Sequence, residues 1–165
     1  LAFSGKVPDT TVRASDSLPL SVSRFDKHYQ QRCGTRSQLY PQVRETLTAL
    51  RGQGVKLAVV TNKEGRYTTT VLNAHGLTPL LDAVVSGDSF PAKKPDPTGV
   101  QSCLSQFGVP PERALFVGDS SIDVATARNA GVRVWMLPYG YNMGQPIEAC
   151  APDRVIVDCS VLLNS

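Results

Sequence analysis

The chain has 165 residues, a length typical of one domain, and its 41% hydrophobic and 19% charged residues are ordinary for a globular protein. Its net charge is only +3 and no run of lysine and arginine stands out, so the composition does not favour nucleic-acid binding. No stretch reaches the ~18 apolar residues that a membrane span needs. The four cysteines are spaced far apart, which predicts reduced thiols in a cytoplasmic protein.

The first 40 residues carry weak structural signals. Residues 1–23 are rich in serine, threonine and proline and are predicted to form a loop, with a short helix at residues 24–32. Clear elements follow, namely an amphipathic helix, a β-branched apolar strand and a second amphipathic helix. These three elements are predicted at residues 41–52, 55–61 and 64–76.

Strands and helices keep alternating through the rest of the chain. Asp96 is predicted to cap a helix that starts at Pro97, and Gly108 is predicted to end it. Strands are predicted at residues 82–87, 113–119, 132–137 and 154–158, and helices at residues 97–108 and 121–130. Apolar strands that alternate with helices are covered on both faces, which predicts an α/β fold with a doubly wound parallel sheet.

Polar side chains follow the predicted strands at the sheet edge where ligands bind in such folds. Thr61 and Asn62 follow the first strand. A hydroxyl and free amides at this turn suit an anionic oxygen, although a simple capped turn is an alternative. Lys94 is followed by two nearby prolines, which stiffen the segment so that its ammonium can meet a phosphate at a fixed distance. The alternative is that Lys93 and Lys94 are both solvated surface residues before a helix start.

Asp119 and Asp123 follow the strand predicted at residues 113–119. One carboxylate at a strand tip and one in the first turn of the next helix can approach the same hard cation, such as Mg²⁺. The alternative is a capping box from Ser120 to Asp123, and the two roles are compatible. A hydroxyl, a lysine and two carboxylates in this order predict phosphoryl chemistry, because the first two neutralise phosphate oxygens and the carboxylates hold the metal.

In these motifs the chain resembles the haloacid dehalogenase superfamily. "VVTNK" is similar to its second motif, Lys94 in "KKPDP" to its third and "FVGDSSID" to its fourth, within residues 39–163. The segments "GDSSIDVATARNAGVRVW" and "LPYGYNMGQPIEACAPDRVIVD" further resemble the bacterial phosphoglycolate phosphatases of this superfamily. The resemblance implies a Mg²⁺-dependent phosphomonoester hydrolase that acts on a small phosphorylated metabolite through an aspartyl-phosphate.

The resemblance also implies a role for each candidate residue. Thr61 and the backbone amide of Asn62 would hold the phosphoryl group. Lys94 would neutralise the phosphate and the nucleophile. Asp119 would bind Mg²⁺. Asp123 would bind the ion directly, bind it through a water molecule, or orient the other ligands around it.

One expected part of this family is missing from the sequence. The superfamily's first motif, an Asp-x-Asp segment after an N-terminal strand, supplies the nucleophile and the general acid/base, and no D-x-D-G-[TS] occurs here. We expect residues 1–38 to be the remnant of a helical cap domain and residues 39–165 to be a Rossmann-like core that lacks its central first strand. Truncation is the favoured explanation, and a nucleophile-free relative is the alternative. The chain alone is then expected to be inactive and marginally stable.

Three other functions stay open at this point. A pyrophosphatase or sugar phosphatase could use the same scaffold, and the core motifs also fit a phosphomutase. A non-catalytic phosphate- or Mg²⁺-binding module would use the same polar residues without turnover. The oligomeric state is not predicted.

Overall fold

The computed structural model describes residues 37–140, 142 and 144–164. The helix predicted at residues 24–32 and nearly all of the expected cap remnant lie outside these residues. The strands are β1 (Ala58–Val60), β2 (Ala83–Val85), β3 (Leu115–Gly118), β4 (Arg133–Met136) and β5 (Arg154–Val155). The α-helices are α2 (Val43–Gly52), α3 (Gly65–Ala74), α4 (Thr98–Phe107) and α5 (Ser121–Ala130). The short 3-10 helices are η1 (Thr78–Leu80), η2 (Pro111–Arg113), η3 (Ile147–Cys150) and η4 (Cys159–Asn164).

Every strand and helix predicted after residue 40 is present, although each strand is shorter than predicted. Asp96 Oδ1 accepts a hydrogen bond from the Thr98 amide at 2.9 Å, as expected for a side chain that caps the helix start, but the N-cap position itself is held by Pro97. The helix begins at Thr98, one residue later than predicted, and ends before Gly108, which has the left-handed conformation. The apolar pattern therefore located the elements, and the turn residues located most of their ends.

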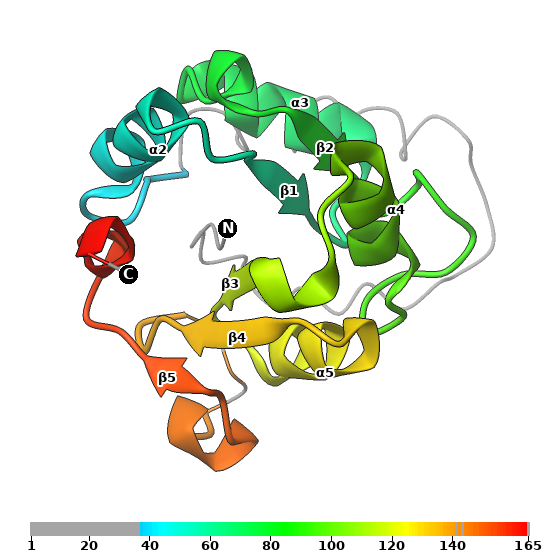
Figure 1. Ribbon diagram of the computed structural model, residues 1–165, viewed down its shortest axis with the longest axis vertical. Coiled ribbons are helices and arrows are strands. Elements are labelled where there is room, and N and C mark those ends of the chain that lie inside the picture. Colours follow the sequence, from blue (N-terminus) through cyan, green and yellow to red (C-terminus); the bar gives the residue numbers. More distant parts are fainter. Residues whose placement is uncertain (1–36, 141, 143, 165) are drawn as a thin grey trace, which may run out of the picture.

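The described strand pairs are all parallel, which confirms an α/β fold with parallel strands but not the single doubly wound sheet that was predicted (Figure 1). They do not form one sheet within the described residues. β1 pairs with β2, while β3, β4 and β5 form a separate three-stranded sheet. The facing edges of β1 and β3 are not paired with each other, so packing has to hold the two sheets together.

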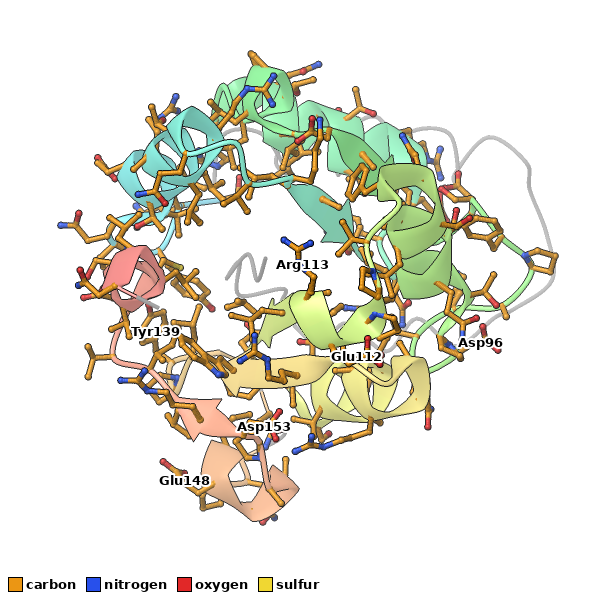
Figure 2. The ribbon with its side chains drawn as sticks, in the orientation of Figure 1. Asp96, Glu112, Arg113, Tyr139, Glu148 and Asp153 are labelled. Carbon is orange, nitrogen blue, oxygen red and sulfur yellow. The ribbon has the colours of Figure 1, made fainter. Side chains whose placement is uncertain are left out.

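A cavity of about 700 Å³ lies between β1 and β3. Apolar side chains of both strands and of helices α2 and α4 line it, and Figure 2 shows Arg113 projecting toward it from the end of η2. Thr46 is one of the lining residues, and its buried hydroxyl has no hydrogen-bond partner among the described residues. The cavity thus lies between two strand edges that do not pair with each other in the described part of the chain, and one of its lining residues carries a hydroxyl that is costly to leave without a partner.

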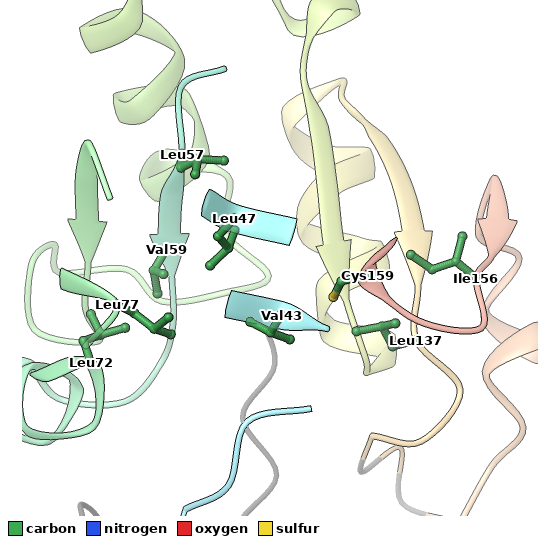
Figure 3. Packing of buried hydrophobic residues seen from close by; sticks show 9 residues of the cluster. All are labelled: Val43, Leu47, Leu57, Val59, Leu72, Leu77, Leu137, Ile156 and Cys159. Carbon is green, nitrogen blue, oxygen red and sulfur yellow. The ribbon is translucent and has the colours of Figure 1, made fainter. Parts of the chain in front are cut away.

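Helix α2 joins the two sheets through one apolar cluster. Val43 and Leu47 of this helix lie between a group around β1 and α3 and a group near the C-terminus (Figure 3). The other members are Leu57, Val59, Leu72, Leu77, Leu137, Ile156 and Cys159. Since full burial of one Leu or Val side chain contributes about 1.5–3 kcal/mol, this cluster is a main source of cohesion between the sheets.

Helix α4 makes a second connection between the sheets, because it packs against both β1 and α5. A second apolar cluster fills the space beneath α5 and includes Val124, Ala127, Val134 and Met136.

No helix in the described part of the chain is long and apolar enough to cross a membrane. Three of the cysteines are described, and Cys103, Cys150 and Cys159 are free thiols.

Candidate active site

The turn that follows β1 is tightly packed. The amide of Thr61 extends the β1–β2 pairing by donating to the Val85 carbonyl at 2.9 Å. The Thr61 hydroxyl accepts a hydrogen bond from the Lys63 amide at 3.1 Å. A Cβ atom on Gly87 would lie 2.1 Å from the Asn62 carbonyl oxygen, so only glycine lets the loop after β2 approach this turn. The backbone near Thr61 is therefore held from two sides.

The side chain of Asn62 fixes the backbone of Lys94. The Lys94 amide donates to Asn62 Oδ1 at 2.8 Å, and Asn62 Nδ2 donates to the Lys94 carbonyl at 3.0 Å. Asn129 Nδ2 donates to the next carbonyl, that of Pro95, at 2.9 Å. The side-chain amide of Asn62, which follows β1, and that of Asn129, in α5, thus hold the backbone of Lys94 and Pro95. The sequence analysis missed this role of the Asn62 side chain.

Replacing Asn62 by alanine is expected to destabilise the chain by about 1–3 kcal/mol, because it leaves a partly buried amide and carbonyl of Lys94 without partners. Chemical unfolding in urea, followed by circular dichroism, measures this loss. Asn129→Ala is the matched control. It removes one exposed hydrogen bond and is expected to cost about 0.5–1 kcal/mol. Equal losses in the two variants would contradict the conclusion that the two hydrogen bonds of the Asn62 side chain hold the backbone of Lys94.

The ammonium of Lys94 forms a buried ion pair with Asp123. Lys94 Nζ lies 2.6 Å from Asp123 Oδ1, and the side chains are only 15% and 6% exposed. The other carboxylate oxygen accepts hydrogen bonds from the Asp119 amide and the Ser120 hydroxyl, each at 3.0 Å. Burial acts to raise the pKa of Asp123, but the charge and hydrogen bond of Lys94 hold that pKa below its usual value.

The capping box suggested by the sequence does not form as expected. Ser120 is the N-cap residue of α5, but its side chain makes no cap hydrogen bond and instead donates to Asp123. The carboxylate of Asp123 accepts from the amide of Asp119 rather than from that of Ser120. Asp123 therefore satisfies one backbone donor ahead of the helix while its other oxygen faces Lys94.

Asp119 lies at the carboxyl end of β3 in a crowded pocket. Tyr40 donates its hydroxyl to Asp119 Oδ2 at 3.3 Å, and the rings of Tyr40 and Tyr139 pack edge to face with centroids 4.5 Å apart. A Cβ atom on Gly140 would lie 2.1 Å from the Cβ of Asp119. Burial, and then the negative charge of Asp123, raise the pKa of Asp119 to about 6. Nothing in the sequence indicated that Tyr40 or Gly140 belongs to this site.

The donor set of the site fits Mg²⁺. The charge of Asp123 raises the pKa of Asp119, so a cation beside both carboxylates would relieve their repulsion. No cluster of three or more histidine, cysteine or acidic side chains suited to a metal occurs among the described residues. Mg²⁺ is commonly held by one or two carboxylates, with water and a substrate phosphate completing its shell. Asp119 and Asp123 are the residues that could hold it.

Four of the five residues singled out by the sequence are linked by direct contacts. Asn62 binds the backbone of Lys94, whose ammonium binds Asp123, which in turn accepts from the amide of Asp119. Thr61 is next to Asn62 in the chain, and its hydroxyl is hydrogen-bonded to the Lys63 amide. One ammonium, a hydroxyl and a carboxylate pair at the carboxyl ends of β1 and β3 can bind a phosphate together with a divalent cation.

Comparisons with known proteins agree with this chemistry. The profile of the haloacid dehalogenase-like hydrolase family matches residues 3–137. A phosphoglycolate phosphatase of Vibrio vulnificus is 44% identical over 140 residues, which are 85% of this chain and 61% of that protein. A phosphoglycolate phosphatase of Pseudomonas putida is 44% identical over 125 residues, which are 76% of this chain and 46% of that protein.

A solved structure gives the same result at the level of the fold. The crystal structure of a predicted phosphoglycolate phosphatase from Haemophilus somnus superposes with a TM-score of 0.82 at 39% identity. The match covers 86% of this chain and 63% of that one. The chain therefore spans less than two thirds of the length of each of these three relatives.

Proposed function

This chain belongs to the haloacid dehalogenase-like hydrolases, and from that premise we propose that it forms the core of a Mg²⁺-dependent phosphomonoester hydrolase. The observation that carries the proposal is the contact network of Asn62, Lys94, Asp119 and Asp123 at one edge of the strands. We propose 2-phosphoglycolate as the substrate because relatives that bear the name phosphoglycolate phosphatase share up to 44% of the matched residues.

Each site residue has a distinct task in the proposed reaction. The Thr61 hydroxyl and the Asn62 amide bind phosphoryl oxygens, and the Lys94 ammonium neutralises their negative charge. Asp119 and Asp123 hold Mg²⁺, which when bound places additional positive charge beside the phosphoryl group. The Asn62 side chain keeps the backbone of Lys94 in place during these steps.

The proposed nucleophile is an aspartate on a strand that inserts between β1 and β3. Its carboxylate oxygen bonds to phosphorus while the bond from phosphorus to the glycolate oxygen breaks, and a general acid donates a proton to that oxygen. Water then hydrolyses the aspartyl-phosphate, which releases inorganic phosphate and restores the carboxylate. The cavity beside both strands supports this proposal, and the relatives contain sequence beyond the part that this chain matches.

We further propose that the described core has no phosphatase activity without such a strand. A related pyrophosphatase or sugar phosphatase would use the same core, and assays with a panel of small phosphates separate these substrates. A non-catalytic phosphate- and Mg²⁺-binding module is the alternative of a different class, since the sequence contains no D-x-D-G-[TS] motif. Binding without turnover after a nucleophile strand has been supplied would favour that module.

Replacing Asp119 by asparagine is expected to weaken Mg²⁺ binding by tenfold or more, because one of the two carboxylates is lost. Isothermal titration calorimetry of the chain with MgCl₂ measures this affinity, and a second titration with inorganic phosphate tests the anion site. Asp88→Asn is the matched control, since exposed Asp88 only accepts a hydrogen bond from the Gly65 amide. Unchanged Mg²⁺ affinity in D119N would contradict the proposed metal site.

A further inference from the structure

The first turn of helix α5 needs a cap that its own residues do not supply. The N-cap Ser120 makes no side-chain cap hydrogen bond, although the exposed amides at a helix start need acceptors. Asp123, at the third helical position, is the residue that would bind back to the helix start in a capping box. Its carboxylate is instead occupied by Lys94, the Asp119 amide and the Ser120 hydroxyl.

The missing acceptor comes from a residue 21 positions further along the chain. Asn142 Oδ1 accepts a hydrogen bond from the amide of Ser121, the first residue of α5, at 2.8 Å. Asn142 Nδ2 donates to the Gln145 carbonyl at 3.1 Å and to Cys150 Sγ at 3.5 Å. The Asn142 side chain is buried, with the residue only 8% exposed. Because both Nδ2 hydrogens have acceptors elsewhere, the oxygen is the atom that faces the helix.

This contact affects which groups Asp123 can bind. If the Ser121 amide lacked an acceptor, the positive end of the helix would attract the carboxylate of Asp123, the acidic residue of the same first turn. A turn of that carboxylate toward the helix start would break its contact with Lys94 or with the Asp119 amide. With Asn142 in place, the Ser121 amide has an acceptor and Asp123 keeps its orientation toward Lys94.

We propose that Asn142 is a positioning residue that caps α5 from outside the helix and thereby keeps Asp123 oriented toward Lys94 and a bound cation. The capping part of this inference stands on the hydrogen bonds alone, and its consequence for the cation rests on the proposed function. The residue that accepts from the Ser121 amide lies beyond strand β4, so the local sequence around α5 could not have predicted this contact.

The test compares two substitutions that separate the acceptor from the donor of the Asn142 side chain. Asn142→Ala removes both, whereas Asn142→Asp keeps an acceptor for the Ser121 amide and loses the donor. Two quantities are measured on the intact chain, namely hydrogen exchange of the Ser121 amide by NMR and the Kd for Mg²⁺ by calorimetry. Asn73→Ala is the control, because Asn73 is exposed and the one hydrogen bond described for its side chain comes from the Thr78 hydroxyl.

In N142A we expect the Ser121 amide to exchange roughly fivefold faster or more, as for a lost helix cap. We expect the Kd for Mg²⁺ to rise roughly tenfold, the low end for residues that support metal ligands. N142D is expected to keep Ser121 protected and to bind Mg²⁺ no more weakly than the unchanged chain. If N142A does not fold, Asn142→Ser replaces it, because a serine hydroxyl is too short to reach the Ser121 amide.

The inference is overturned if N142A lowers stability while Ser121 exchange stays as in N73A, since Asn142 would then only hold its own loop. It is also overturned if N142D loses Ser121 protection as fully as N142A does. If the unchanged chain binds no Mg²⁺, the proposed function fails, and the Ser121 exchange rates still decide whether Asn142 caps α5.

Discussion

Lys94→Ala is expected to destabilise the chain by about 3 kcal/mol, because removing one partner of a buried ion pair leaves an uncompensated charge. Asp123 would keep its burial, at 6% side-chain exposure, and lose the ammonium 2.6 Å away. Since whole domains are stable by only about 5–15 kcal/mol, this is a large fraction of the total. Urea unfolding followed by circular dichroism gives the loss directly.

The neighbouring lysine is a control of the same type. Lys93 is exposed, and Lys93→Ala is expected to change stability by no more than about 0.5 kcal/mol. The double variant Lys94→Met with Asp123→Asn removes both charges, and it is expected to recover part of the stability that Lys94→Met alone loses. If K94A costs no more than K93A, the contact between Lys94 and Asp123 contributes nothing to the fold.

A peptide that forms a parallel strand is expected to bind between β1 and β3 and to raise the Tm of the chain by about 5–10 °C at 100 times its Kd. The peptide would supply backbone partners along the edges of β1 and β3, which do not pair with each other, and it would remove the apolar lining of the cavity from water. The probe is a synthetic peptide of about six β-branched residues followed by Asp-Leu-Asp-Gly-Thr. Differential scanning fluorimetry measures the shift.

Two matched peptides separate binding from catalysis. A version whose first aspartate is replaced by asparagine is expected to raise the Tm equally. Phosphate release from 2-phosphoglycolate with Mg²⁺ is expected only with the aspartate version. A scrambled peptide with a central proline is expected to do neither, because proline cannot complete the ladder. Binding of the aspartate peptide without turnover would favour the non-catalytic module, and absence of any Tm shift would contradict the strand site.

A substitution at Thr46 tests whether the bound peptide strand fills the cavity between β1 and β3. Its hydroxyl has no partner among the described residues, so Thr46→Val is expected to stabilise the free chain by about 1 kcal/mol. If the bound strand supplies a hydrogen bond to this hydroxyl, the gain disappears in the presence of the peptide. A gain that persists unchanged would place the peptide away from Thr46.

Local sequence patterns were sufficient for the secondary structure and predicted the edge at which the site lies. Apolar runs between turn residues predicted all five strands, and the helices between β1, β2, β3 and β4 indicated their parallel arrangement, whereas no helix was predicted between β4 and β5. Polar residues directly after β1 and β3 predicted a ligand-binding edge, because parallel strands end on the same side of a fold, and that edge stays a prediction. The candidate roles of Thr61 and Asn62 in binding phosphate stay predictions.

Contacts between distant segments could not be predicted in this way. Lys94 meets Asp123 across 29 positions, Tyr40 meets Asp119 across 79, and Asn142 reaches the start of α5 across 21. Nothing in the spacing of these residues indicates that their side chains meet. The separation of the strands into two sheets, joined by α2 and α4, is likewise a property of packing.

The sequence by itself determined the fold class, the order of the elements and the types of side chain available to the site, because these depend on local hydrophobic periodicity and on turn chemistry. The tertiary structure alone decided which groups meet. In the folded chain Asp123 contacts Lys94 instead of forming the expected capping box. The Asn62 side chain binds the backbone of Lys94, and Asn142 accepts from the first amide of α5. The physical reason is that a buried polar atom takes its partner from whichever segment the packing brings within hydrogen-bond distance.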